Sequence, residues 1–341
     1  EALHGAVDEM AHAETFHGYA PDLGYEFLRS AMAKNDYQAK GCDINADEIF
    51  ISDGAKEDCG NIQEIFSKDS KIAVCDPVYP VYVDTNTMDG KKIIYMNGTE
   101  ENDFLPMPDD KVKADIIYLC SPNNPTGAIM EKKDLEEIAE VIREKDIFII
   151  SDEIYAELTY KEKHVSIVSL PGMQERTVLI NGFSKAYAMT GWRLGYALAP
   201  EPILQQMLKI HQFAIMCAPT TSQYAAVEAL KNGDEDIAMM REAYNQRRRY
   251  LMHAFKEMGL QCFEPYGAFY VFPCIKEFGM TSDEFAERLL REEKVAVVPG
   301  TAFGDCGEGF LRISYAYSLE NLQIAMEKIE AFIKRLREEK K

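Results

Sequence analysis

Three segments of the sequence end in side chains that could do chemistry together. Asp152 and Tyr155 follow the apolar run DIFIIS, and Asn124 follows the run ADIIYLC. Lys185 follows a third run, TVLINGF, and Arg193 lies eight residues beyond it. In open α/β sheets the loops after the strands converge at one edge. We therefore expect a carboxylate, a phenol, an amide, an amine and a guanidinium to share one cleft.

The neighbours of Lys185 suggest what its amine does. A single lysine is most often a solvated surface residue. An amine that forms a Schiff base needs a polar cleft and a carbonyl partner, and pyridoxal 5′-phosphate uses such a lysine together with an acid at its pyridine nitrogen. Asp152 supplies that acid in this interpretation, although an aspartate after a strand could also cap a helix.

The segments that position these residues predict an α/β fold. Five apolar runs, each followed by a polar or Gly/Pro cluster, indicate buried strands at 47–54, 71–77, 114–122, 146–153 and 177–183. Amphipathic helical patterns lie between them, the clearest at 132–145. Alternation of strands and helices predicts a mostly parallel sheet with helices on both faces.

The last third of the chain has a different pattern. Longer helical stretches surround shorter strand patterns at 267–273 and 310–316, and an amphipathic helix is indicated at 318–336. We therefore predict a large domain over residues 1–235 and a smaller α+β C-terminal domain over residues 236–341.

Composition excludes several classes of partner. The chain has 341 residues, of which 47% are hydrophobic, so it can bury a substantial core. With 57 acidic and 37 basic residues its formal charge is −20, which argues against nucleic acid and anionic membranes as partners. No apolar run is long enough to suggest a membrane span, and we expect a cytoplasmic protein. The eight cysteines lack zinc-ligand spacing, so we expect reduced thiols and no metal site.

Five motifs resemble those of the class I and II aminotransferases of pyridoxal phosphate fold type I. In chain order they are SPNNPTG, SDEIY, GFSKAYAMTGWRLGY, PYGAFYVFP and GFLRISYA. The resemblance implies the two-domain α/β fold just described, with pyridoxal 5′-phosphate as the cofactor. It also implies transfer of an amino group between an amino acid and a 2-oxo acid, with 2-oxoglutarate and glutamate as the expected pair.

The resemblance assigns catalysis to Lys185, Asp152 and Tyr155. Lys185 would hold the cofactor and then move a proton between the substrate Cα and C4′ of the cofactor. Asp152 would keep the pyridine nitrogen protonated. Tyr155 and Asn124 would donate hydrogen bonds to the phenolic oxygen of the ring. Asn124 precedes Pro125, so by itself it could also simply form a turn.

Other residues are implied to bind the cofactor phosphate. The turn Gly54, Ala55 and Lys56 follows a strand and opens a helix, so its backbone N–H groups could cradle an anion. Ser184 and Arg193 match two further phosphate-binding positions of the family.

The remaining site residues concern the ring, the substrate and a second subunit. Tyr79 matches the aromatic residue that stacks on the pyridine ring. Arg312 matches the arginine that grips the substrate carboxylate with a bidentate fork, beside Asn124. Tyr19 matches a tyrosine that reaches the phosphate in the neighbouring subunit, which implies a homodimer. Phe269 and Tyr270 are expected to shape the strand that faces the cleft.

Two parts of the chain resemble different subgroups. ETFHGYAPDLGYEFLRSA, ISDGAKEDCGNIQEIF and DPVYPVYVDTNTMDG are similar to LL-diaminopimelate aminotransferases of lysine biosynthesis. From SDEIYAELTY onward the sequence is closer to aspartate, aromatic and alanine aminotransferases, and HQFAIMCAPTTSQ lacks an asparagine typical of the diaminopimelate enzymes. We expect LL-diaminopimelate as the donor, with the aspartate, aromatic or alanine type as the alternative.

Two other functions fit parts of this pattern. A pyridoxal phosphate carbon–sulfur β-lyase would use the same cofactor residues for elimination. A non-catalytic effector-binding module is disfavoured by the acidic charge and by the presence of both Lys185 and Asp152. The resemblance also implies a segment before Glu1 with a glycine near the substrate carboxylate, and a longer chain between Gly90 and Lys91.

Overall fold

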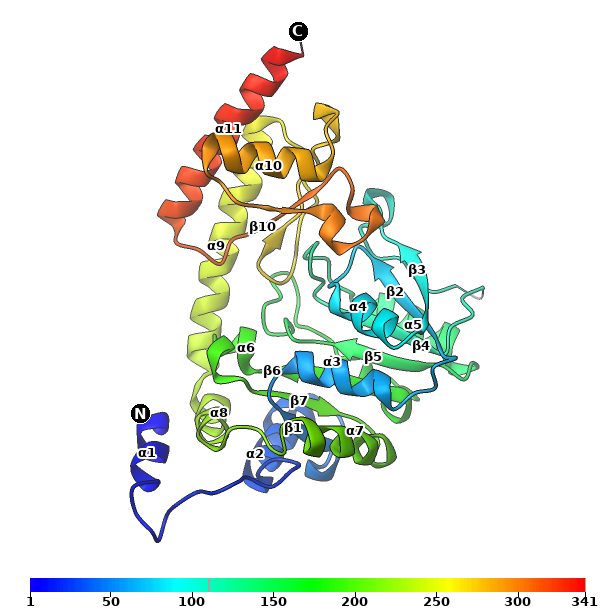
Figure 1. The fold of residues 1–341 in the computed structure, drawn as a ribbon, viewed down its shortest axis with the longest axis vertical. Coiled ribbons are helices and arrows are strands. Elements are labelled where there is room, and N and C mark those ends of the chain that lie inside the picture. Colours follow the sequence, from blue (N-terminus) through cyan, green and yellow to red (C-terminus); the bar gives the residue numbers. More distant parts are fainter. Residues whose placement is uncertain (110, 341) are drawn as a thin grey trace.

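The structure is a computed structural model that describes residues 1–109 and 111–340. In these residues the chain forms two sheets joined by one long helix. The smaller sheet lies above the larger one in Figure 1, and α9 (Asp234–Met258) runs between the two levels. Of the helices described here, none is long and apolar enough to cross a lipid bilayer.

The large sheet is mostly parallel, as predicted. Within the described chain it has seven strands in the order β1-β7-β6-β5-β4-β2-β3. Their bounds are β1 Ile49–Ser52, β2 Lys71–Asp76, β3 Lys92–Asn97, β4 Ile116–Cys120, β5 Phe148–Asp152, β6 Thr177–Gly182 and β7 Gly195–Leu198. Strands β2 to β6 pair in parallel, whereas β7 is antiparallel to both β6 and β1. The sequence patterns missed β3 and β7.

Helices cover both faces of this sheet. The helices of this part are α1 Ala2–Glu9, α2 Glu26–Met32, α3 Ala55–Glu64, α4 Val81–Met88, α5 Lys132–Arg143, α6 Phe183–Ala186, α7 Glu201–Ala214 and α8 Thr220–Asn232. Ile49 of β1 packs in a cluster with α2 and α8, whereas the next residue, Phe50, packs with α3 and α7. Successive side chains of a strand point to opposite faces, so burial of both faces explains the nearly continuous apolar strands.

The small sheet has the antiparallel order β8-β10-β9 in the described residues. Its strands are β8 Tyr270–Val271, β9 Val298–Pro299 and β10 Leu311–Ser314, and the helices beside it are α10 Ser282–Glu293 and α11 Leu319–Glu339. The apolar stripe predicted for the last helix is buried, since Leu322, Ile329 and Ile333 of α11 pack in one cluster with residues of α9 and α10.

The predicted domain boundary between residues 235 and 236 falls in the first turn of α9. This helix contributes Leu251 and Phe255 to the core of the small sheet. The division of the chain at that position stays a prediction.

The parallel strands bring three chain segments together at one edge of the large sheet. Cys120 at the end of β4 lies opposite Asp152 at the end of β5, and Asp152 lies opposite Ile180 of β6. The residues that follow these strands therefore converge on the side of the sheet that faces the small domain.

Candidate active site

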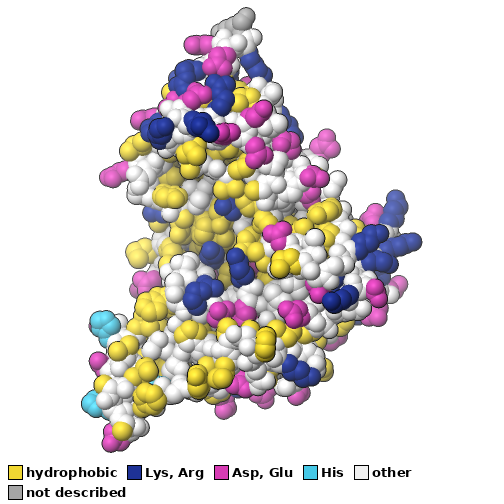
Figure 2. Space-filling view, in the orientation of Figure 1, with side chains coloured by type: hydrophobic (Ala, Val, Ile, Leu, Met, Phe, Trp, Pro, Cys, Tyr) yellow, Lys and Arg dark blue, Asp and Glu magenta, His cyan; other side chains and the backbone are white. Residues whose placement is uncertain are grey.

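A cavity of about 440 Å³ lies where these segments converge. On the face shown in Figure 2 the surface is hollowed near the middle of the molecule, with hydrophobic side chains inside the hollow and Lys or Arg side chains beside it. Most of the side chains singled out from the sequence line the cavity, namely Ala55, Lys56, Tyr79, Asn124, Asp152, Tyr155, Ser184, Lys185, Arg193 and Arg312.

Asp152 is buried at the floor of the cavity, with 5% of its surface exposed. Its Oδ1 accepts a hydrogen bond from the backbone N–H of Ile154 at 3.1 Å, and its Oδ2 accepts one from the hydroxyl of Tyr82. Burial raises the pKa of Asp152, although both hydrogen bonds act in the opposite direction. A cationic group in the cavity would offset the cost of burying this carboxylate.

Lys185 projects into the same cavity from α6. Its Nζ lies 5.8 Å from the ring centroid of Tyr155 and 5.6 Å from that of Phe269. Burial lowers the pKa of Lys185, and the nearby guanidinium groups lower it further, while the negative charge of Asp152 raises it. A lowered pKa increases the unprotonated fraction of the amine, which is the nucleophilic form.

The turn before α3 presents backbone N–H groups to the cavity. Gly54 is the N-cap of α3, with φ of +135°, a backbone conformation that favours glycine. The first helical hydrogen bond of this turn is donated by Glu57 N–H to the carbonyl of Gly54 at 2.9 Å. The N–H groups of Ala55 and Lys56 precede that bond and point along the helix axis toward its N-terminus. Such an end attracts anions.

Close backbone packing places Arg193 beside this turn. A Cβ on Gly195 would lie 2.5 Å from Ala55 N, so β7 can approach the turn only because residue 195 has no side chain. Likewise, a Cβ on Gly54 would lie 2.5 Å from Nη2 of Arg193. The guanidinium of Arg193 and the side chain of Ser184 thus surround the N-terminus of α3 in the cavity wall. Guanidinium, hydroxyl and N–H donors together suit a phosphate.

Arg312 of β10 enters the cavity from the small sheet. Its Cζ lies 4.6 Å from the ring centroid of Tyr270 and 4.6 Å from that of Phe303. Nη1 donates to Oδ1 of Asn124 at 3.0 Å, and Nε is buried without a partner among the described residues. The guanidinium is held between two rings and retains donors for a carboxylate.

Tyr155 and Tyr79 occupy two further walls. The hydroxyls of Tyr155 and Tyr270 lie 2.9 Å apart, and burial raises the pKa of Tyr155 well above its usual range. Tyr79 is half-buried, with its ring 5.6 Å from that of Tyr82 and 5.9 Å from Nζ of Lys56. The cavity is therefore lined by aromatic rings as well as by the charged side chains of Asp152 and Lys185.

The sequence analysis missed Tyr82 and Phe303 and gave Tyr270 only a shaping role. Tyr82 lies three residues after Tyr79 in DPVYPVY and belongs to α4, which begins at Val81, so its place beside the motif residue was an available signal. Phe303 lies nine residues before Arg312 in the sequence, outside the motifs that were recognised.

Tyr19 lies outside this cavity. It belongs to the N-terminal arm, by which we mean residues 1–25, before α2. In this arm α1 packs against α8, and 84% of the surface of Tyr19 is exposed. Within its own chain Tyr19 does not line the cavity. A contact with a phosphate would therefore have to form in another copy of the chain.

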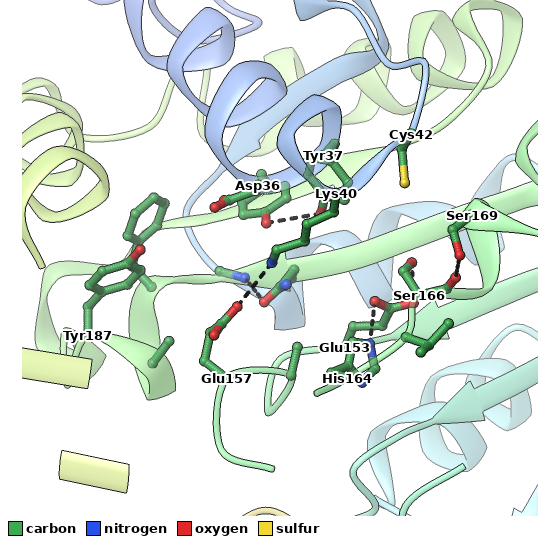
Figure 3. Close-up of a pocket in the computed structure, with 17 residues that line it drawn as sticks. Asp36, Tyr37, Lys40, Cys42, Glu153, Glu157, His164, Ser166, Ser169 and Tyr187 are labelled. Carbon is green, nitrogen blue, oxygen red and sulfur yellow. Dashed lines mark hydrogen bonds and ion pairs between the residues drawn. The ribbon is translucent and has the colours of Figure 1, made fainter. Parts of the chain in front are cut away.

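A second, smaller cavity of about 170 Å³ is lined by chain neighbours of Lys185, among them Phe183, Ala186 and Tyr187 (Figure 3). Lys40 in its wall contacts Glu157 at 3.2 Å, and His164 contacts Glu153 at 2.7 Å. Lys40 and the His164 ring are each already beside a carboxylate, so these two side chains offer a phosphate less free positive charge than the Lys185 cavity does.

Sequence comparison assigns the chain to a known family. The model of the family described as aminotransferase class I and II matches residues 1–329. Aspartate aminotransferase of Pyrococcus abyssi is 43% identical over 336 residues, which cover 94% of this chain and 85% of that protein. LL-diaminopimelate aminotransferase of Lachnospira eligens is 40% identical over 353 residues, which cover 97% of this chain and 87% of that protein.

Solved structures agree with this assignment. The aromatic aminotransferase from Pyrococcus horikoshii superimposes with a TM-score of 0.92 at 38% identity, covering 98% of this chain and 91% of that one. The aspartate aminotransferase from Thermus thermophilus with maleate gives a TM-score of 0.89 at 33% identity, covering 97% and 87%. The chain therefore belongs to the class I and II aminotransferases, whose cofactor is pyridoxal 5′-phosphate.

Proposed function

We propose that this aminotransferase moves the amino group of LL-diaminopimelate to 2-oxoglutarate, at the cavity around Lys185, as a homodimer. The shared cavity of Lys185 and Asp152 is the observation that carries the site. The choice of donor is supported by the diaminopimelate-type sequence of the first ninety residues and by the 40% identity with the Lachnospira eligens enzyme.

The cavity residues fit pyridoxal phosphate by their chemistry. When bound, the cofactor supplies an aldehyde that combines with amines and a pyridinium ring that withdraws electrons from the substrate Cα. The buried carboxylate of Asp152 is suited to a protonated pyridine nitrogen, because opposite charge offsets the burial that raises its pKa. The N-terminus of α3 is suited to the phosphate, with Gly54 permitting the close approach of Arg193.

In this proposal each side chain acts on a stated atom. The amine of Lys185 removes the proton from the substrate Cα and returns it at C4′ of the cofactor. The hydroxyl of Tyr155 and the amide of Asn124 would hold the phenolic oxygen of the ring as donors, and Tyr79 would supply an aromatic surface for the ring. Ser184, Ala55 and Lys56 contribute donors to the phosphate.

Arg312 binds the α-carboxylate in both half-reactions. The amino donor and the 2-oxo acid each carry a carboxylate at the same position, so one guanidinium fork can orient either of them. Stacking between Tyr270 and Phe303 supports this assignment, since it fixes the plane of the fork before substrate arrives.

The homodimer is supported by apolar side chains exposed near the N-terminal arm. Tyr19, Phe16 and Phe213 are exposed by 84%, 60% and 93%. Surface of this kind is typical of interfaces. In the proposed dimer Tyr19 donates to the phosphate bound by the partner.

Subunit complementation tests the dimer. Tyr19→Ala and Lys185→Ala should each be inactive or weak as purified proteins. After subunit exchange, a hybrid dimer has one site with both residues intact, so about a quarter of wild-type activity should return. Failure to recover activity, with hybrid formation shown by differently tagged subunits, would refute the shared site.

A panel of amino donors tests the substrate. Holoenzyme should convert its cofactor to the amine form with LL-diaminopimelate more efficiently than with aspartate, tyrosine or alanine, as followed by absorbance. Aspartate is the second candidate, because the Pyrococcus abyssi aspartate enzyme is 43% identical. A larger kcat/KM for aspartate would overturn the choice of donor, and release of ammonia and pyruvate from a cysteine conjugate would indicate the β-lyase.

A further inference from the structure

A carboxylate at the end of β2 in the large sheet is bound by backbone N–H groups of a turn that precedes β10 of the small sheet. Asp76, the last residue of β2, is 4% exposed. Its Oδ2 accepts from Asp305 N–H at 3.1 Å and its Oδ1 accepts from Cys306 N–H at 3.1 Å. Burial raises the pKa of Asp76, whereas the two N–H donors favour its charged form. In Figure 1 the orange turn that contains these donors lies beside β2.

The receiving turn is shaped around this carboxylate. Gly304 has φ of +133°, and a Cβ on it would lie 2.0 Å from Oδ1 of Asp76. A third bond links the same segments, because Val78 N–H donates to the carbonyl of Phe303 at 2.9 Å. Three hydrogen bonds therefore hold the 3₁₀ turn Gly300–Phe303 and the residues after it against the end of β2.

This turn supplies one of the two rings that enclose Arg312. Phe303 is 6% exposed, and its ring centroid lies 4.6 Å from Cζ of Arg312, as does that of Tyr270. A bidentate contact with a carboxylate requires a fixed guanidinium plane. Displacement of Phe303 would leave Arg312 stacked on one side only.

We propose that Asp76 is a positioning residue for the substrate carboxylate, which acts by holding Phe303 against the guanidinium of Arg312. The inference rests on the proposed role of Arg312. It also links the two ends of the site, since Asp76 is only three residues from Tyr79, the proposed partner of the cofactor ring. The hydrogen bonds of Asp76 thus hold the turn that carries Phe303 near the end of β2, three residues before Tyr79.

Replacement of one carboxylate oxygen tests this proposal. In Asp76→Asn the new NH₂ group would face one of the two N–H donors, so one hydrogen bond is lost and two donors oppose each other. We expect KM for the donor and for 2-oxoglutarate to rise about tenfold, with kcat within about threefold of wild type, because a hydrogen bond to a charged group is lost. Asp305→Asn removes an exposed carboxylate of the same turn and should leave both constants unchanged.

Two further variants ask whether the effect passes through Phe303. Gly304→Ala keeps the Asp76 carboxylate but places a Cβ against it, and should raise KM in the same way. Phe303→Leu should also raise KM, and the Asp76→Asn/Phe303→Leu double variant should be no worse than the poorer single variant. Additive effects in the double variant would show that Asp76 does not act through this ring.

Hydrogen exchange of the holoenzyme gives a readout independent of turnover. The amides of Asp305 and Cys306 should exchange faster in Asp76→Asn than in wild type or Asp305→Asn. Unchanged exchange at these amides would overturn the proposed contact. If wild type shows no transamination with any donor, the proposed function fails instead, and the exchange result still reports on the contact.

Discussion

The hydroxyl of Tyr82 donates a hydrogen bond to Oδ2 of Asp152 in the interior of the large domain. Tyr82 is 1% exposed and its ring stacks on that of Tyr118, with centroids 5.1 Å apart, so the direction of the hydroxyl is fixed. A hydrogen bond to a carboxylate stabilises the ionised form. Tyr82 therefore opposes the burial that raises the pKa of Asp152.

Tyr82→Phe removes this bond without opening a cavity. We expect kcat to fall about tenfold, the magnitude typical of a lost hydrogen bond to a charged group. The pKa of Asp152 should rise further, so activity should decline at a higher pH on the acid side. Steady-state rates across pH measure both effects. Tyr118→Phe is the matched control, and equal rates in the two variants would argue against a role for Tyr82.

Asp152→Asn should stabilise the cofactor-free protein and should abolish the activity of the holoenzyme. A raised pKa in the folded state means that stability is lost as pH rises from the unfolded pKa through the folded pKa. The neutral amide avoids that loss, so the thermal midpoint should rise by roughly 2 °C at pH 8. Below the unfolded pKa the difference should vanish. A lower midpoint of the variant at pH 8 would contradict this account of burial.

Lys185→Ala removes the proposed nucleophile and base together. Turnover should fall by several orders of magnitude, whereas noncovalent binding of cofactor should persist. Absorbance spectra and rate assays with the best donor provide the measurements. Lys209→Ala, at an exposed site of α7, should behave as wild type. Retention of even a tenth of the activity would reject Lys185 as the catalytic amine.

Arg312→Lys keeps the positive charge but loses the planar fork and its contacts with two rings. KM for donor and acceptor should both increase, by about tenfold or more, because a single ammonium cannot make the bidentate contact. Kinetics with each substrate varied in turn test this, with Arg249→Lys on the surface of α9 as control. An effect on only one of the two substrates would show that Arg312 does not bind the carboxylate they share.

Gly195→Ala should weaken cofactor binding without touching the cofactor directly. Its Cβ would lie 2.5 Å from Ala55 N, so the turn at the N-terminus of α3 must move. We expect about tenfold weaker affinity for pyridoxal phosphate, since misplaced donors lose hydrogen bonds to an anion. Titration of the cofactor-free protein by absorbance gives the affinity. Gly191→Ala, where an added Cβ meets nothing within 4 Å, should bind normally.

Sequence reasoning predicted the large sheet and the residues near its edge better than the small domain. Asp152, Asn124 and Lys185 each follow a long apolar strand, and parallel pairing brings such strand ends together. β7 was missed because its four residues overlap the motif GFSKAYAMTGWRLGY, which was interpreted for its functional side chains and not as a strand. β9 was missed because a two-residue strand leaves no detectable alternation.

Contacts between distant segments could not be predicted from local pattern. The turn after Phe303 binds Asp76, which lies more than two hundred residues earlier in the chain. Such a contact depends on the relative placement of two domains. Propensity and periodicity describe neighbours along the chain and contain no information of that kind.

The spacing between Asp76 and Tyr79 limits how this protein can change during evolution. Two intervening residues join the contact with the small domain to the aromatic wall of the cavity. Insertion or deletion of one residue there would displace Asp76 relative to Tyr79 and so disturb the contact with the turn or the aromatic wall of the cavity. Replacement of other side chains in the cavity would leave this spacing intact.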